Sequence, residues 1–416
     1  MAFIPQARAS ALPHGVRARL APSARRRVRA RAVEHGGDTA FLVGPVDALE
    51  ARSWSQVEDA VERAAAGLVR SGLRPDQVVL SLLPAGHGVP ELDVALRAVG
   101  AVVVHVSPEV GADELARRLA GADVRLVVCE DESELQRLVG LPLPSAMVFA
   151  LGGGRGWDRL LELGAERLVM DPDAVDRADR VVDPAGTTAR VLRSGAPLGR
   201  VADPDRAGEL VPGDGVALLC GDLADPFVQQ VRDAHLESGG ALLHVAAPAD
   251  LPAAMAAVRP SVLALGQDAV AAVPGLLATA AAGDHRRRRP GRARAADPAT
   301  LRAWAGGNLA SVVAADVPDV VRKAFTAGGA RVSGTGAPAL LPADLPVPPP
   351  VVLGDAADLP RRARREPARE FQLETERETA QPEPDESAFV LPSLSLIGGE
   401  SFLDKLLLAK AREAAS

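Results

Sequence analysis

The side chains that most often do chemistry occur in this sequence without the spacing that metal or catalytic sites require. The seven histidines show no metal-ligand spacing, and neither a Gly-x-Ser-x-Gly elbow nor a P-loop lysine motif occurs. His105 and His244 fall inside apolar runs, which favours core histidines with satisfied hydrogen bonds. His87 stands in a Gly-flanked loop before a predicted helix, where facing a cleft is the alternative. The sequence therefore predicts no metal site.

Cysteine and lysine are equally sparse. The two cysteines, Cys129 and Cys220, each end an apolar run, so we interpret both as buried free thiols, with a redox or metal role as the alternative. The sequence has no tyrosine, and its only lysines are Lys323, Lys405 and Lys410. The basic charge is therefore almost entirely arginine.

The overall charge argues against a nucleic-acid-binding protein, because the formal net charge is −7. The basic run 285–298 contains no interleaved aromatic residue, so we interpret it as a solvated loop, with a phosphate or nucleic-acid patch as the alternative. No apolar stretch approaches the roughly 20 residues that span a bilayer. Residues 1–33 lack the apolar core of a signal peptide. We therefore expect a cytoplasmic protein without a membrane span.

Short apolar runs alternate with amphipathic segments from about Phe41 to Val332, which is the pattern of βα units around a mostly parallel sheet. Ser53 and Gln56 have the spacing of a capping box at the start of one such helix. The predicted helices are 54–69, 110–120, 226–237, 251–258 and 317–327. The predicted strands are 78–83, 101–106, 124–129, 146–151, 215–220, 241–246 and 261–266. The fold class is α/β, with mostly parallel twisted sheets flanked by helices.

Changes in composition separate a folded body from its two ends. We interpret residues 1–24 as a flexible basic arm. After residue 341 a proline-rich stretch leads into a mixed-charge stretch with few large apolar side chains. Such a segment buries too little surface to fold, which predicts a disordered linker over 342–388. Residues 389–416 are predicted to form a short amphipathic tail helix.

The tail carries a signal for an interaction. Ser401 and Asp404 have the Ser-x-x-acid spacing of a helix start. One apolar stripe follows from Phe402, Leu403, Leu406 and Leu407. A short helix is marginal alone, so the stripe needs a surface to bury against. We interpret residues 389–411 as an element that binds a partner protein in a groove; folding back on the chain's own body is the alternative. The lack of a Lys/Arg cluster argues against a membrane surface.

Three motifs follow one another in a fixed order within residues 53–131. Residues 72–76 read Gly-x-x-Pro-Asp, residues 84–91 end in a glutamate, and residues 100–108 read from Gly-Ala-Val to a proline. In this order they resemble the start of acyl-CoA synthetases and related adenylate-forming enzymes, the AMP-binding family, although Pro75 replaces that family's glycine. The resemblance implies the family's large N-terminal domain over residues 25–341, without its small C-terminal domain.

The resemblance also implies a set of nucleotide-binding elements. In this family a Ser/Thr/Gly-rich loop with a lysine holds the ATP phosphates, and a Tyr-Gly-x-Thr-Glu motif positions adenine and binds magnesium. A Thr-Gly-Asp motif holds the ribose, and a lysine of the small domain stabilises developing charge. The vestigial counterparts here are Gly186, Thr187, Thr188 and Arg190 for the loop, and Gly334, Thr335 and Gly336 for the adenine motif.

These counterparts depart from the family pattern. Ala189 stands where the loop has a glycine, no lysine follows, and arginine replaces a compact ammonium poorly. The adenine segment has neither tyrosine nor glutamate, and a plain Gly-rich turn is the alternative there. The ribose motif has no counterpart, and Lys405 and Lys410 stand in no comparable context. We therefore identify no catalytic residue and expect no cofactor.

Two functional hypotheses follow from this pattern. The first is a degenerate, non-catalytic member of the family that acts as a scaffold or interaction component through its tail. The second is an ATP-dependent acyl- or aryl-activating ligase whose missing residues are atypical or supplied by a partner, and only this hypothesis requires ATP and magnesium. An unrelated α/β protein is a third alternative.

Overall fold

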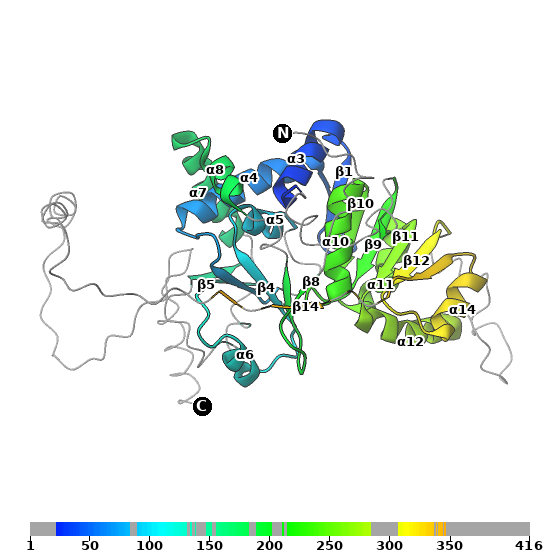
Figure 1. The fold of residues 1–416 in the computed structure, drawn as a ribbon. Helices are drawn as coiled ribbons and strands as arrows, with labels where there is room; N and C mark the ends of the chain where they lie inside the picture. Colours follow the sequence, from blue (N-terminus) through cyan, green and yellow to red (C-terminus); the bar gives the residue numbers. More distant parts are fainter. Residues whose placement is uncertain are drawn as a thin grey trace, which may run out of the picture.

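The computed structural model describes residues 22–346 apart from 84–89, 131–133, 135–137, 139–146, 152–154, 183–188, 202–209, 212–213, 284–306, 337, 339 and 344. Within this part of the chain, two seven-stranded, mostly parallel sheets are present (Figure 1). The predicted fold class is confirmed.

Sheet A is parallel except at one edge, where β1 and β2 pair antiparallel. Its strands, in spatial order, are β13 (Arg331–Gly334), β12 (Ser311–Ala314), β11 (Val262–Leu265), β9 (Val216–Cys220), β10 (Ala241–Val245), β1 (Thr39–Val43) and β2 (Glu50–Ser53).

Sheet B is also antiparallel only at one edge, where β8 pairs antiparallel with both β14 and β7. Its strands, in spatial order, are β14 (Leu340–Pro342), β8 (Gly199–Val201), β7 (Arg190–Leu192), β4 (Val102–Val106), β3 (Val78–Ser81), β5 (Val124–Cys129) and β6 (Met147–Ala150). All seven strands predicted from apolar runs are present.

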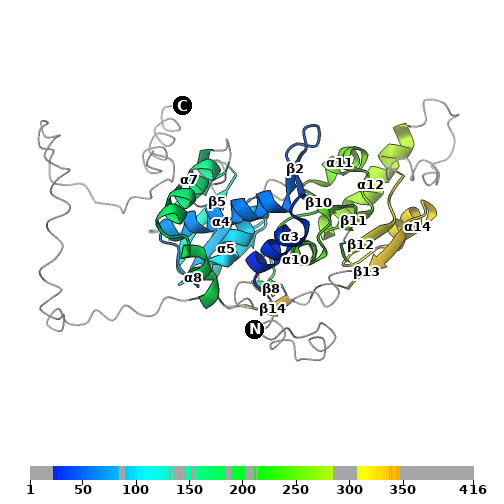
Figure 2. The same ribbon diagram turned by 90° about the horizontal axis from the view of Figure 1, so that it is seen from above.

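Helices cover both faces of both sheets, which explains the continuous apolar strands. The outer face of sheet A packs against α11 (Leu251–Val258), α12 (Gln267–Gly283) and α14 (Asp319–Ala327). The outer face of sheet B packs against α6 (Ala112–Arg118). The inner face of sheet A packs against α3 (Ala24–His35), α10 (Pro226–Ser238) and the first half of α4 (Trp54–Arg70). The inner face of sheet B packs against the second half of α4, α5 (Pro90–Ala98) and α7 (Arg155–Met170), and Figure 2 shows these helices from above. The helix α8 (Ala174–Val181) and a short 3-10 helix, Pro248–Asp250, complete the described elements.

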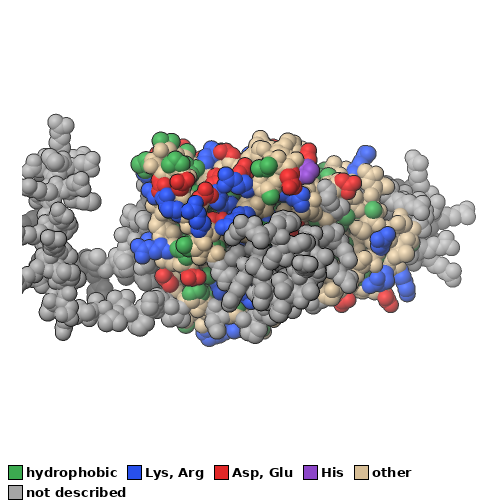
Figure 3. Space-filling view, turned by 45° about the horizontal axis from the view of Figure 1, so that its top comes forward, with side chains coloured by type: hydrophobic (Ala, Val, Ile, Leu, Met, Phe, Trp, Pro, Cys, Tyr) green, Lys and Arg blue, Asp and Glu red, His purple; other side chains and the backbone are tan. Residues whose placement is uncertain are grey.

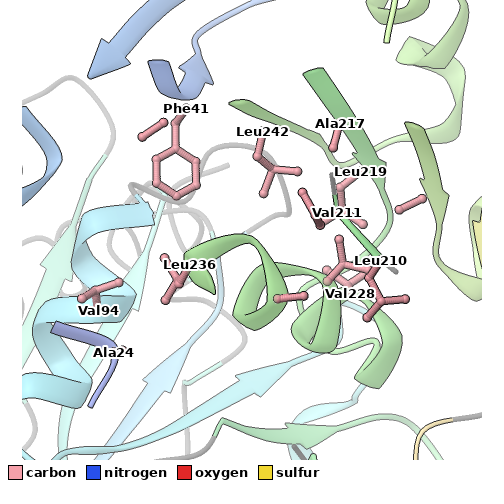
Figure 4. Packing of buried hydrophobic residues seen from close by; sticks show 14 of the residues in the cluster. Ala24, Phe41, Val94, Leu210, Val211, Ala217, Leu219, Val228, Leu236 and Leu242 are labelled. Atoms are coloured by element: carbon pink, nitrogen blue, oxygen red, sulfur yellow. The ribbon is translucent and has the colours of Figure 1, made fainter. Parts of the chain in front are cut away.

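The inner face of sheet A shows how this layering buries apolar surface. Phe41, Leu219 and Leu242 come from three strands of the sheet, and Val228 and Leu236 come from α10 (Figure 4). Neighbouring strand residues alternate between the inner and outer cores, as the two-residue period of a strand requires. Each sheet therefore packs against two separate hydrophobic cores, one on each face.

The helix α4 is shared by both inner cores. Its first half contributes Trp54, Val57 and Val61 to the core on sheet A, and its second half contributes Ala64 and Leu68 to the core on sheet B.

The predicted capping box at the start of α4 is confirmed. The backbone N–H of Gln56 donates to the Ser53 hydroxyl at 3.3 Å, and the backbone N–H of Ser53 donates to Gln56 Oε1 at 2.9 Å. Trp54 Nε1 donates to the carbonyl of Gly239 at 3.2 Å, just beyond the end of α10. These bonds fix the start of α4 against the sheet A layer.

Candidate functional site

The carboxyl edge of sheet A is the place where ligands bind in open α/β sheets. Gly334 is the last residue of β13, and Thr335 and Gly336 follow it. The Thr335 hydroxyl donates to the backbone carbonyls of Ala314 at 3.4 Å and Gly336 at 3.2 Å, and Gly336 has a φ of +80°. This part of the predicted nucleotide site is therefore a glycine-rich turn, in which the Thr335 hydroxyl is hydrogen-bonded to backbone carbonyls.

The other part of the predicted nucleotide site is the segment that leads into β7 of sheet B. Arg190 is the first residue of β7, where it lies in register with Val104 of β4. Gly186, Thr187 and Thr188 lie outside the described residues. The two predicted segments therefore belong to different sheets, and β14 is the strand through which the chain passes from the edge of sheet A to sheet B.

The carboxylate of Asp225 occupies the space between two helix N-termini at this edge. Asp225 precedes α10, and its Oδ1 accepts the backbone N–H of Phe227 at 2.9 Å. Its Oδ2 accepts the backbone N–H of Gln267, the first residue of α12, at 2.6 Å. Burial raises the pKa of Asp225, and the two backbone hydrogen bonds act in the opposite direction. The chain's own carboxylate thus takes the place that a helix N-terminus offers to an anion.

Arg193 connects sheet B to the same edge. It lies just after β7, and its guanidinium donates to Gln267 Oε1 at 2.8 Å and lies 3.6 Å from Asp268 Oδ1. The carboxyl edge at β9 and β11 is therefore lined by two carboxylates, and the arginine nearest to them already contacts α12.

Replacing Asp225 by alanine is expected to lower the free energy of unfolding by about 1–3 kcal/mol, because two buried N–H groups lose their acceptor. Asp268→Ala is the matched control on the same edge, since Asp268 is 58% exposed and its contact with Arg193 is longer. We expect that variant to lose less than about 1 kcal/mol. Urea denaturation measures both. Equal losses in the two variants would contradict the capping role of Asp225.

A second polar group of residues lies buried between the sheets and is called here the interlayer cluster: Asp93 and Arg97 of α5, His105 of β4, and Arg232 and Asp233 of α10. Arg97 donates from Nη2 to Asp93 Oδ2 at 2.9 Å and from Nη1 to Asp233 Oδ1 at 2.5 Å. Arg232 Nη2 lies 3.8 Å from Asp93 Oδ2. Because α5 packs on sheet B and α10 on sheet A, the Arg97–Asp233 pair joins the two layers.

The charges of the interlayer cluster compensate one another. Burial alone would raise the pKa of Asp93, but Arg97 and Arg232 hold it well below its usual range. Burial opposes the charge of Arg97, yet Asp233 and Asp93 raise its pKa. Burial lowers the pKa of His105, so its imidazole is neutral near pH 7. The cluster therefore contains buried charges in pairs beside a neutral histidine.

His105 does not have the satisfied hydrogen bonds that its sequence context predicts. Its Nε2 lies 3.6 Å from Asp93 Oδ1, which is too far for a hydrogen bond, and neither ring nitrogen has a partner among the described residues. Ser81, its register partner on β3, also has a buried hydroxyl without a partner among them. For His244 the prediction is confirmed, because its Nε2 lies 2.9 Å from the carbonyl oxygen of Gly221.

Two small cavities adjoin the interlayer cluster, and both are lined by Leu223 and Arg232. The first faces sheet B and is also lined by Ser81, Asp93 and His105. The second faces sheet A, on the side of β1 and β10. Each offers about 20 Å³ of room to the centres of water molecules. This is space for water, and it is far below what a bound acyl group needs.

The remaining predicted features concern thiols, metals and membranes. Cys129 and Cys220 are buried free thiols, as predicted, and burial raises the pKa of Cys220 to about 12. Within the described ranges no three His, Cys, Asp or Glu side chains are placed to hold a metal ion. None of the described helices is both long and apolar enough to cross a bilayer.

The interlayer cluster was not predicted from the sequence. One half of it has a readable signal, since Asp93 and Arg97 are four residues apart, the spacing of an ion pair along a helix. Arg232 and Asp233 stand next to each other within α10 and carry no comparable signal. Their pairing with α5 depends on how two distant helices pack.

The surface is mixed in charge. On the face shown in Figure 3, acidic and basic side chains are interspersed over the described helices. Arg26 and Arg29 of α3, for example, contact Asp179 and Asp176 of α8. These arginines therefore make ion pairs within the chain.

Comparison with known proteins supports the resemblance seen in the motifs. The sequence model described as AMP-binding enzyme matches residues 28–154. This range contains α4, α5 and strands β3 to β5, which carry the ordered motifs. No curated protein matches the chain in sequence.

Solved structures share the architecture at low identity. The A domain of carboxylic acid reductase from Segniliparus rugosus, in complex with AMP and a co-purified carboxylic acid, is 14% identical with a TM-score of 0.55, over 80% of this chain and 64% of that one. A long-chain-fatty-acid-CoA ligase from Archaeoglobus fulgidus is 14% identical with a TM-score of 0.55, over 75% and 61%. VinN, in complex with L-aspartate, is 17% identical with a TM-score of 0.53, over 76% and 75%.

At these identities the likeness to solved structures shows the fold. Residues 28–154 match the model of AMP-binding enzymes, and the described part of the chain has the fold of the large N-terminal domain of adenylate-forming enzymes.

Proposed function

We propose that this chain is a non-catalytic member of the AMP-binding enzyme family that acts as a scaffold or interaction component in the cytoplasm. The position of Asp225 is the observation that carries the proposal. Its carboxylate accepts N–H groups at the starts of both α10 and α12, where a phosphate would otherwise find positive potential.

Electrostatics at the same edge support this proposal. A polyphosphate bound beside β9 and β11 would face the carboxylates of Asp225 and Asp268. Arg193, the nearest basic side chain among the described residues of this edge, already contacts Gln267 and Asp268. Bringing a nucleotide here would therefore require breaking contacts that the chain makes with itself.

The chemistry of acyl-adenylate formation depends on preorganised positive charge, and removal of one such donor typically slows a reaction by about 10²–10³. The only lysine among the described residues, Lys323, is exposed on α14, on the outer side of sheet A. The turn after β13 has neither the tyrosine nor the glutamate of the family's adenine motif. Several family donors are thus replaced together.

The interaction role rests on the tail sequence. The apolar stripe of Phe402, Leu403, Leu406 and Leu407 lies outside the described residues, and its role remains a prediction from helical spacing. A chain that keeps the family fold while using its nucleotide edge for internal contacts needs another way to act, and a partner-binding helix supplies one.

Carboxylate-dependent exchange of pyrophosphate into ATP tests the proposal directly. We expect the purified full chain to show no exchange above background with aliphatic, aromatic and amino acids. ATP with magnesium is also expected to leave its thermal midpoint unchanged, although a ligand at a hundredfold excess over its Kd would stabilise the fold by about 2.7 kcal/mol.

The contrary result is carboxylate-dependent exchange of pyrophosphate into ATP that disappears in the double variant Thr187→Ala plus Thr188→Ala. It would establish the alternative, an ATP-dependent acyl- or aryl-activating ligase. The interaction role has its own readout: proteins that co-purify from the native host with the wild-type chain should be lost from Phe402→Asp plus Leu406→Asp. Identical capture by both chains would remove the tail from the proposal.

A further inference from the structure

The cavity on the sheet B side of the interlayer cluster combines apolar lining with unpaired polar atoms. Leucine and valine side chains of α5, β4, β5 and the segments that follow β3 and β9 form the apolar lining. Three residues with buried, unpaired polar atoms line it: Ser81 through Oγ, Asp93 through Oδ1 and His105 through both ring nitrogens. Ser81 is 4% exposed and His105 is 3% exposed, so bulk solvent does not serve them.

Leaving these atoms unpaired would be costly. A buried donor or acceptor without a partner typically costs about 1–3 kcal/mol. The unpaired set contains both kinds of group. The Ser81 hydroxyl and one nitrogen of the neutral His105 ring can donate, whereas Asp93 Oδ1 and the other ring nitrogen can only accept. A water molecule has two donors and two acceptors and matches this mixture.

We propose that this cavity is a hydration site, in which one or two ordered water molecules complete the hydrogen bonds of Ser81, Asp93 and His105. The available volume of about 20 Å³ exceeds the roughly 10–15 Å³ that one water needs. The number of polar partners also lies in the range of two to four that buried waters use.

Other occupants fit the cavity less well. An added anion would lie against the Asp93 carboxylate, whose charge Arg97 and Arg232 already balance. A metal ion is disfavoured because the described residues bring no three suitable ligands together. A larger organic molecule exceeds the volume. An empty cavity would leave four polar atoms unpaired.

The hydration site has a structural role at the contact between the two layers. Ser81 and His105 belong to strands of sheet B, and Arg232 of α10, which also lines the cavity, belongs to the sheet A layer. Water bound here therefore adds hydrogen bonds between the two layers to the direct Arg97–Asp233 ion pair. The polar contact between the layers is hydrated, although apolar cores lie on both sides of it.

A high-resolution crystal structure of the full chain tests the site, together with a second data set from the same crystals under xenon pressure. We expect one or two density peaks of water size within hydrogen-bond distance of Ser81, Asp93 or His105, and no xenon in the cavity. Dry apolar cavities bind xenon, so the two data sets distinguish the alternatives.

Variants provide an independent check. Ser81→Ala should lose or displace the water nearest to position 81. Ser261→Ala is the control, because the Ser261 hydroxyl donates directly to the carbonyl of Val216 at 3.3 Å and lies away from the cavity. Xenon in the wild-type cavity, an empty cavity, or density larger than water would each overturn the proposal.

Discussion

Replacing Arg97 by methionine is expected to lower the free energy of unfolding by about 3–5 kcal/mol, because it leaves two buried carboxylates without their common partner. Asp93 and Asp233 both accept hydrogen bonds from Arg97, and the side chains of all three residues are at most 12% exposed. Arg232 is the one remaining cation in the interlayer cluster, and it lies 3.8 Å from Asp93. Denaturation with urea or guanidinium measures the loss.

A double variant separates the cost of a broken pair from the value of the pair itself. Arg97→Met with Asp233→Leu removes both members of the pair that joins the layers and fills the space with apolar side chains, while Asp93 keeps Arg232 as its neighbouring cation. Buried ion pairs replaced in this way often give neutral or more stable proteins, so much of the loss should be recovered. A double variant less stable than Arg97→Met alone would show that the charges themselves hold the two layers together.

Acidification is expected to destabilise the fold steeply between about pH 6 and pH 4. Burial lowers the pKa of His235 to about 4 and that of His244 to about 3, and it also lowers the pKa of His105. An unfolded histidine titrates near pH 6.5. In this window the unfolded state binds more protons than the folded state, so stability falls as the pH falls.

Each histidine adds a slope of about 1.4 kcal/mol per pH unit while its unfolded form is protonated and its folded form is neutral. Three carboxyl groups act in the opposite direction. Burial raises the pKa of Glu62, Glu91 and Asp225, so acidification relieves the cost of their buried charges. The measured slope is therefore the difference between the two sets.

His235 gives the sharpest test of this pH dependence. Its ring stacks on Trp54 with centroids 5.3 Å apart, and Nε2 lies 2.7 Å from the carbonyl oxygen of Gly240. His235→Phe keeps an aromatic ring there and should flatten the decline of stability below pH 6, in spite of a lower stability at pH 7. His35→Gln, at a histidine that is 48% exposed, should leave the slope unchanged. Denaturant midpoints measured across the pH range give a stability curve for each protein. The curve of His235→Phe should diverge from that of the wild type below pH 6, and the curve of His35→Gln should run parallel to it.

The strands that could be predicted from the sequence are those buried on both faces. Runs such as 102–106 and 124–129 are continuous in valine and leucine because helices cover both sides of the sheet. Several short strands at or next to a sheet edge were not predicted. β8, Gly199–Val201, and β13, Arg331–Gly334, are only three and four residues long and owe their conformation to a neighbouring strand. Their own residues carry little apolar pattern.

The candidate site could be predicted only where local sequence determines it. A turn at Gly334 to Gly336 could be predicted because the segment is rich in glycine, and the structure places it at the end of β13. Asp225 is a local N-cap, but its second hydrogen bond, to Gln267, crosses 42 residues of chain. The Arg97–Asp233 pair crosses 136 residues. Contacts of this kind arise from the packing of whole layers and leave no spacing rule in the sequence.

Because α4 is shared between the inner cores, the two layers are energetically coupled. Its first half is buried with Trp54 on sheet A and its second half with Leu68 on sheet B. Opening either layer alone would expose half of this helix, and a helix stabilised by packing does not persist as an isolated half. Backbone amides of α4 should therefore exchange with solvent only in the global unfolding event, and the described body should behave as one cooperative unit.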